Sequence, residues 1–150
     1  MLGCGWSSKQ LNMIYYHQED TSFNVKHKLA IRKWVNATIK NEGKTPDDIT
    51  YIFCSDQYLL ELNRSALDHD YFTDIITFDY CEGDIVSGDL FISIDRVEDN
   101  AKTLGHSFID ELHRVMIHGV LHLCGYKDKS KKEEQTMREK EDYYLNLRSF

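Results

Sequence analysis

The chain has 150 residues, 41% of them hydrophobic, and a formal net charge of −7, so its length suits one domain with a sizeable buried core. The negative charge argues against non-specific binding of nucleic acid over the whole surface, although a local basic patch is compatible with it. No apolar run is long enough to cross a bilayer, and the first residues lack the apolar segment of a secretory leader. We therefore expect a cytoplasmic protein without a membrane partner.

The order of the predicted elements indicates an α+β fold. Runs of β-branched and aromatic residues predict strands, apolar residues three and four apart predict helices, and serines mark helix starts. In chain order we expect a polar, flexible tail over residues 1–12, a strand over 12–18, a helix over 26–42, a strand over 49–54 and a short helix from Ser55 through Asn63. Then follow strands over 73–79 and 89–95, a helix over 96–104, a helix from Ser107 and a charged final helix from Ser130. Strands that cluster ahead of helices favour an α+β layer structure, with residues 13–150 as a single domain.

The predicted helix over residues 107–124 carries a pair of candidate metal ligands. It is apolar over most of its circumference, which is typical of a buried helix. His118 and His122 are four residues apart, so they lie one above the other and both imidazoles can reach one cation. One narrow stripe is polar, and it consists of Ser107, Glu111, Arg114, His118 and His122.

The residues after this helix supply a third candidate ligand. Gly125 can take the left-handed conformation that ends a helix, and the turn can bring Asp128 to the same point. Three protein ligands leave a position open for water, which is the plan of a catalytic metal site. The spacing HxxxHxxGxxD matches the metallopeptidase pattern HExxHxxGxxH, except that Gly119 replaces the glutamate that serves as general base. Since glycine is unfavourable in a helix interior, we expect Gly119 to permit close packing or substrate access.

The segment HGVLHLCGYKD, residues 118–128, resembles the HGxLHLxGYDH signature of the YbeY family, metal-dependent endoribonucleases of rRNA maturation. The resemblance extends upstream to residues 62–63, 70–78 and 88–93. It implies a compact α+β domain in which a small mixed sheet of about four strands packs with helices and is zincin-like around the metal.

The resemblance also implies a set of metal ligands, and this chain departs from the family at two positions. His118 and His122 match metal-binding histidines, while Asp128 stands where the family has a third histidine. Carboxylate oxygen and imidazole nitrogen bind zinc at similar distances, so we expect one Zn²⁺, with selectivity tilted slightly toward Mn²⁺ or Mg²⁺. Leu67 stands where the family has an arginine, so Arg64 or Arg114 would have to supply charge to a phosphate.

These observations predict a cytoplasmic, metal-dependent endoribonuclease that acts on single-stranded rRNA in ribosome maturation and quality control. Its expected partners are rRNA and the ribosomal subunit, with no DNA. The catalytic candidates are His118, Arg114 and Arg64, and the metal ligands are His118, His122 and Asp128.

Two alternatives stay open. A metallopeptidase-like hydrolase would need another base, and Glu111, the only one on the polar stripe, is expected about 10 Å from His118. A non-catalytic, ribosome-associated binding module would use the metal only to staple the turn, and Leu67 is its best support. The lysines at positions 127, 129, 131 and 132 are explained more simply as a solvated helix start than as an RNA contact.

Overall fold

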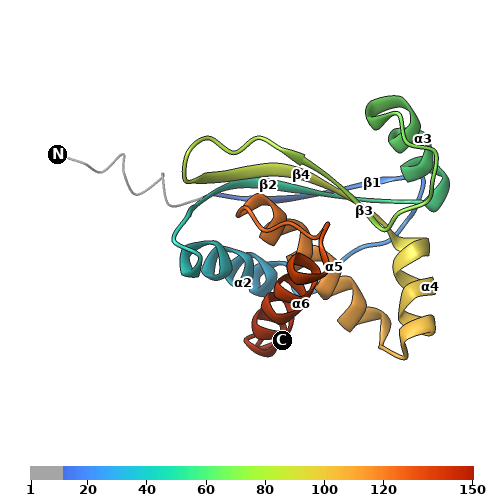
Figure 1. The fold of residues 1–150 in the computed structure, drawn as a ribbon. Helices are drawn as coiled ribbons and strands as arrows, with labels where there is room; N and C mark the ends of the chain where they lie inside the picture. Colours follow the sequence, from blue (N-terminus) through green and yellow to red (C-terminus); the bar gives the residue numbers. More distant parts are fainter. Residues whose placement is uncertain (1–11) are drawn as a thin grey trace.

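The computed structural model describes residues 12–150, which form four strands and five helices (Figure 1). The predicted tail therefore lies outside the described residues, except for Asn12. The strands are β1 (Ile14–Glu19), β2 (Thr45–Cys54), β3 (Ile75–Asp79) and β4 (Ile85–Ser93). The helices are α2 (Lys28–Asn41), α3 (Asp56–Leu67), α4 (Ile94–Leu104), α5 (Phe108–Leu123) and α6 (Lys131–Asn146).

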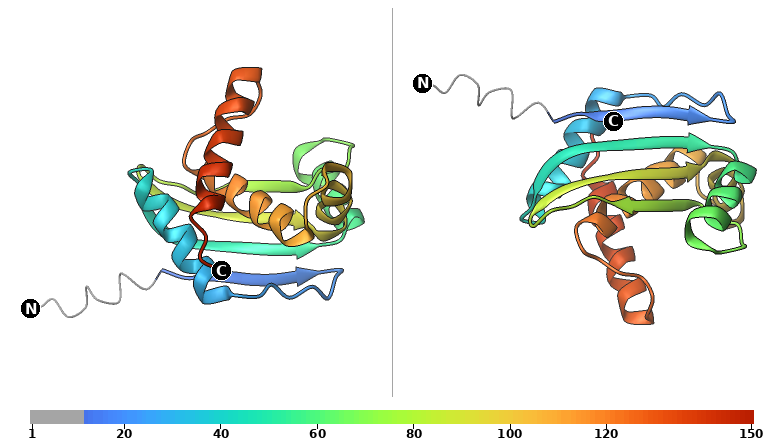
Figure 2. Two further views of the ribbon diagram at one scale, coloured as in Figure 1. Left: turned by 90° about the horizontal axis from the view of Figure 1, so that it is seen from below. Right: turned by 90° about the horizontal axis from the view of Figure 1, so that it is seen from above.

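The four strands form one mixed sheet with the order β1-β2-β4-β3. β2 pairs in parallel with both β1 and β4, whereas β3 pairs antiparallel with β4 at the sheet edge. The views in Figures 1 and 2 agree that α2, α5 and α6 lie on one face of this sheet, while α3 and α4 lie at one end. The predicted α+β class with a small mixed sheet is confirmed.

Several predicted boundaries differ from the structure, and the clearest case is the junction between β4 and α4. The expected strand over 89–95 ends at Ser93, because the Ser93 side chain accepts a hydrogen bond from the backbone N–H of Arg96 and caps α4. Apolar alternation continues through Ile94, but the local capping bond turns the chain into a helix two residues earlier than expected. The predicted cap at Ser55 is confirmed, although α3 continues past Asn63 to Leu67.

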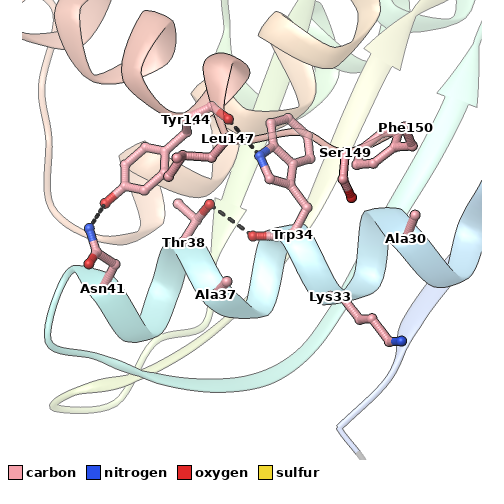
Figure 3. Close-up of a pocket in the computed structure, with 10 residues that line it drawn as sticks. All are labelled: Ala30, Lys33, Trp34, Ala37, Thr38, Asn41, Tyr144, Leu147, Ser149 and Phe150. Atoms are coloured by element: carbon pink, nitrogen blue, oxygen red, sulfur yellow. Dashed lines mark hydrogen bonds between the residues drawn. The ribbon is translucent and has the colours of Figure 1, made fainter.

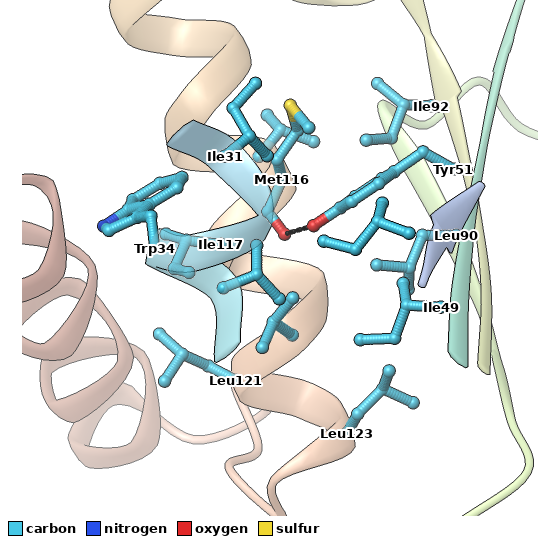
Figure 4. Packing of buried hydrophobic residues seen from close by; sticks show 14 of the residues in the cluster. Ile31, Trp34, Ile49, Tyr51, Leu90, Ile92, Met116, Ile117, Leu121 and Leu123 are labelled. Atoms are coloured by element: carbon cyan, nitrogen blue, oxygen red, sulfur yellow. Dashed lines mark hydrogen bonds between the residues drawn. The ribbon is translucent and has the colours of Figure 1, made fainter. Parts of the chain in front are cut away.

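Helix α5 is the central element of the core. It packs against β3 and β4 on one side and against α2, α4 and α6 on others. Tyr51 of β2 is fully buried and donates a hydrogen bond to the carbonyl oxygen of Met116, 3.0 Å away, so a polar group links sheet and helix inside the apolar layer (Figure 4). The burial expected from the all-round apolar pattern of this helix is confirmed, and Cys124 also packs in the core. No helix within residues 12–150 is both long and apolar enough to span a membrane.

Gly119 lies where α5 faces the sheet. A Cβ atom added at this position would lie 2.8 Å from Cδ1 of Ile75 and 3.0 Å from Cδ2 of Leu90. Both distances are shorter than ordinary van der Waals contact, so close packing explains why a helix interior contains glycine here. The polar stripe, which lies on a different face, is free to carry the two histidines.

Replacing Gly119 with alanine is therefore expected to destabilise the protein. The gain of about 1 kcal/mol in helix propensity is outweighed by overpacking, which typically costs about 1–3 kcal/mol. Urea unfolding of the variant and the wild type measures the difference. Ile75→Val removes Cδ1 of Ile75, the atom nearest to the added Cβ. The double variant Gly119→Ala with Ile75→Val should therefore lose less stability than the sum of the losses in the two single variants. A Gly119→Ala protein more stable than the wild type would contradict this explanation.

Candidate metal centre

The end of α5 and the turn after it position the three predicted ligands. His118 and His122 lie one helical turn apart, with ring centroids separated by 4.6 Å. Gly125 has a φ of +109°, which only glycine adopts readily. The amide of Tyr126 donates to the carbonyl oxygen of Leu121, 3.1 Å away, and this bond folds the chain back toward the helix. Asp128 thereby returns to the face that carries both histidines.

The three side chains converge on one point, as the spacing predicted. Oδ2 of Asp128 lies 3.3 Å from Nε2 of His118 and 3.2 Å from Nε2 of His122. Zinc binds nitrogen and oxygen ligands at roughly 2.0–2.2 Å, so two ligand atoms of a tetrahedral site lie about 3.3–3.6 Å apart. The donor set and its spacing therefore fit a divalent cation, and the described residues contain this one group suited to hold it.

Both imidazoles are oriented through their second nitrogen. Nδ1 of His118 lies 2.5 Å from Oε2 of Glu141 in α6, and Nδ1 of His122 lies 2.8 Å from the carbonyl oxygen of Tyr126. A carboxylate and a carbonyl only accept hydrogen bonds, so each Nδ1 must donate. Each Nε2 faces Oδ2 of Asp128, and with the proton of the neutral imidazole on Nδ1, the Nε2 lone pair is available to bind a metal.

Glu141 is a buried carboxylate with two partners. Its Oε1 accepts a hydrogen bond from Nη1 of Arg114 at 2.8 Å, while Oε2 accepts from His118. Burial alone would raise the pKa of Glu141, but the hydrogen bonds from His118 and Arg114 outweigh it and lower the pKa. Burial likewise opposes protonation of His118, yet Glu141, Asp74 and Asp128 together raise its pKa. The same negative field favours a bound cation.

Helix α6 is held in place by a second set of contacts. Nε1 of Trp34 in α2 donates to the carbonyl oxygen of Tyr144 at 2.7 Å, and Asn41 donates to the Tyr144 hydroxyl at 2.8 Å (Figure 3). Glu42 accepts from the Tyr126 hydroxyl at 2.6 Å. Asn41 and Glu42 lie at the C-terminal end of α2 and anchor both α6 and the ligand-bearing turn there, while Trp34 holds α6 at the middle of α2. The apolar pocket of about 340 Å³ in Figure 3 lies beside this anchor and away from the ligands.

The ligands line a pocket of about 630 Å³ together with residues of α3, the loop after it and β3. Asp74 and Asp79 also line this pocket, and Lys129 is the only lysine or arginine among its described lining residues. Burial raises the pKa of Asp74, although the charge of His118 partly opposes this. The lining of the pocket is therefore acidic, and a bound cation would offset part of this negative charge.

The structure does not place the two predicted arginines in this pocket. Arg114 is 16% exposed and pairs with Glu141 and with Asp142, whose Oδ1 lies 2.6 Å from Nη2. Arg64 is 51% exposed and pairs with Asp70 at 2.5 Å. Leu67, in contrast, does line the pocket.

Glu141 was missed by sequence reasoning, although the sequence contains a signal for it. Met137 and Tyr144 mark the inward face of the final helix, and Glu141 lies between them at helical spacing. An acidic residue on an apolar face needs a buried partner. The sequence alone does not reveal that this partner is His118.

The α+β fold, with two histidines on one helix and a carboxylate in the turn after it, is the arrangement expected of a metal-dependent hydrolase. A family model described as endoribonuclease YbeY matches residues 13–148. The endoribonuclease YbeY of Cytophaga hutchinsonii is 55% identical over 139 residues, covering 91% of this chain and 96% of the relative. That of Parabacteroides distasonis is 51% identical over 134 residues, covering 89% of this chain and 94% of the relative.

A solved structure agrees with this similarity. The solution structure of TM1509 from Thermotoga maritima has a TM-score of 0.63 and 29% sequence identity, and the match covers 89% of this chain and 87% of that one. The chain belongs to the YbeY family of endoribonucleases.

Proposed function

We propose that residues 13–150 form a single metal-dependent endoribonuclease domain, which cleaves single-stranded rRNA in the cytoplasm during ribosome maturation and quality control. The observation that carries this proposal is the convergence of His118, His122 and Asp128 at a pocket, in a chain whose relatives are named endoribonucleases. The relatives' name implies an RNA substrate and hydrolysis of its phosphodiester bonds. Association with the ribosomal subunit is the further step of the proposal.

We propose that the three ligands hold one Zn²⁺, with Mn²⁺ or Mg²⁺ as alternatives that the carboxylate makes more favourable than a third histidine would. A bound ion of this kind lowers the pKa of water and stabilises charge on a phosphoryl oxygen. The protein's own contribution is orientation, since Glu141 and the Tyr126 carbonyl hold both imidazoles in the metal-binding tautomer.

The site has few cationic side chains that could bind an RNA phosphate. Lys129 lines the pocket, and Arg64 is exposed on α3 next to the loop that forms its rim. We propose these two as phosphate contacts. Arg114 acts in this proposal through Glu141, whose position it holds.

The base that the peptidase alternative was expected to use, Glu111, does not lie at the pocket. Glu111 is buried, and its carboxylate pairs with His106 at 3.1 Å. Neither residue is among those that line the metal pocket. Gly119, at the position of the peptidase glutamate, faces the sheet. Neither candidate for the peptidase's glutamate base therefore faces the metal pocket, and the relatives' name favours a phosphodiester substrate instead.

RNA cleavage tests the proposed function directly. Protein stripped by a chelator is expected to cleave neither single-stranded nor duplex RNA, and Zn²⁺, Mn²⁺ or Mg²⁺ should restore cleavage of the single strand. His122→Ala should stay inactive in every metal, whereas His17→Ala, an exposed histidine on β1, should match the wild type. Cleavage that persists in chelator would refute the proposal. Tight RNA binding without turnover in any metal would indicate the binding module, and metal-dependent hydrolysis of an unfolded protein would indicate a peptidase.

A further inference from the structure

The loop between α3 and β3 carries an aromatic pair at the rim of the metal pocket. The rings of His69 and Tyr71 are stacked, with centroids 5.2 Å apart and planes inclined by 21°. The Tyr71 hydroxyl and Nδ1 of His69 lie 3.0 Å apart and form a hydrogen bond, which holds the two rings together. Both residues line the same pocket as the metal ligands, and Tyr71 is nevertheless 55% exposed. A large aromatic surface is thus presented to solvent beside the ligands.

The pair stands on a buried support. Asn63 of α3 is 1% exposed, and its Nδ2 donates to the carbonyl oxygen of Tyr71 at 2.9 Å. The amide of His69 donates in turn to the carbonyl oxygen of Asn63 at 3.0 Å. The next residue, Phe72, packs under the Arg96 guanidinium, 5.1 Å from its ring centroid. These contacts fix the loop backbone on both sides of the exposed ring, so its position needs little ordering when a ligand binds.

The charge of the pocket indicates what this ring could bind. Three carboxylates, those of Asp74, Asp79 and Asp128, line the pocket with a single ammonium group, that of Lys129. Leu67 contributes an apolar side chain at the same wall. Side chains here therefore attract phosphate weakly, and a polynucleotide must gain affinity from another source. Stacking of a base on an aromatic ring is such a source, because every nucleobase has a π face.

We propose that His69 and Tyr71 form a stacking platform that receives one unpaired nucleobase of the RNA beside the metal site. The proposal rests on the proposed function and names the part of the substrate that this pocket recognises. A base within a duplex already has neighbours on both faces, so only an unpaired base can stack on the platform. The platform thereby gives a physical reason for a preference for single strands.

Kinetics with Tyr71 variants test the platform. Tyr71→Ala is expected to raise KM for a single-stranded RNA oligonucleotide about 5- to 150-fold, the range for loss of one stacked base, with kcat changed less than about twofold. Tyr71→Trp keeps an aromatic face but lacks the hydroxyl that bonds to His69, so its KM should lie much closer to the wild-type value than that of Tyr71→Ala. Tyr143→Ala removes another tyrosine, 51% exposed on α6, and should change neither constant. An unchanged KM for Tyr71→Ala would overturn the proposal.

An RNA oligonucleotide that lacks one base shows whether Tyr71→Ala acts by losing a stacked base or by disturbing the loop. Scanning an abasic site along the oligonucleotide should reveal one position at which the wild type loses affinity by a similar factor. At that position Tyr71→Ala should show no further loss, because the partner of the missing base is already gone. Binding measured with metal-free protein makes the result independent of turnover. If the wild type neither binds nor cleaves RNA when metal is present, both the platform and the proposed function fail. If it cleaves RNA but the losses from the abasic site and from Tyr71→Ala add fully, only the platform fails.

Discussion

Asp128→Ala is expected to abolish metal-dependent RNA cleavage while leaving the fold intact. In the proposed site the carboxylate supplies one of the three ligand atoms. Its removal should therefore weaken metal binding by more than the roughly 10- to 100-fold that loss of a supporting hydrogen-bond partner costs. The Asp128 side chain is 39% exposed, and truncation of a surface side chain usually changes the free energy of unfolding by less than about 0.5 kcal/mol. Competition with a chromophoric chelator measures the affinity, and kcat/KM for RNA measures the activity.

Two further substitutions at this position define the role of the carboxylate. Asp128→His supplies a nitrogen ligand, as the resemblance to the family signature suggests, and should restore Zn²⁺ binding with less tolerance for Mg²⁺. Asp128→Asn keeps the size of the side chain but removes its charge, so its affinity should fall between those of the wild type and the alanine variant. If Asp128→Ala retains the Zn²⁺ affinity of the wild type, the carboxylate is not a ligand.

Glu141→Leu is expected to be the most destabilising change at the site. It leaves the guanidinium of Arg114 without one of its two carboxylate partners, Asp142 being the other, and breaking a buried ion pair from one side typically costs about 3–5 kcal/mol. His118 also loses the acceptor for its Nδ1 proton. Urea unfolding measures the stability loss, and metal affinity should fall about 10- to 100-fold because the imidazole is no longer held in one tautomer.

A more conservative pair of variants separates stability from positioning. Glu141→Gln keeps the volume of the side chain, but an amide has a single acceptor oxygen and cannot serve both Arg114 and His118. The double variant Arg114→Met with Glu141→Leu removes both buried charges and should recover much of the lost stability, while metal affinity stays low. Glu139→Gln, an exposed glutamate on the same helix, is the matched control. Recovery of metal affinity in the double variant would show that Glu141 acts only through stability.

Nitrogen NMR of His118 reports which ring nitrogen carries the proton, and a loss of stability alone would not change this. In the wild type the Nδ1-protonated form should dominate in metal-free protein at a pH where the imidazole is neutral, because Glu141 accepts that proton. In Glu141→Leu the two tautomers should mix. His122 should be unchanged in both proteins, since its Nδ1 donates to the Tyr126 carbonyl.

The sequence by itself determined the cluster of candidate metal ligands and the burial of its helix. His118, His122 and Asp128 lie within one helix and the turn that follows, so helical periodicity and one glycine are enough to bring them together. The serine caps at Ser55 and Ser107 were predictable for the same reason, since a capping hydrogen bond spans about three residues. Such features depend on neighbouring residues and need no knowledge of the rest of the fold.

Only the tertiary structure decided which distant groups support that cluster. Glu141 lies 23 residues beyond His118, and it reaches the imidazole because α6 docks on α2 and α5. The order of the sheet and the pairing of Arg114 with Glu141 likewise follow from packing between separate elements. Stacking of His69 on Tyr71 over the pocket also depends on where α3 and β3 place their loop. Contacts of this kind result from the burial of many side chains at once, which no local pattern in the chain encodes.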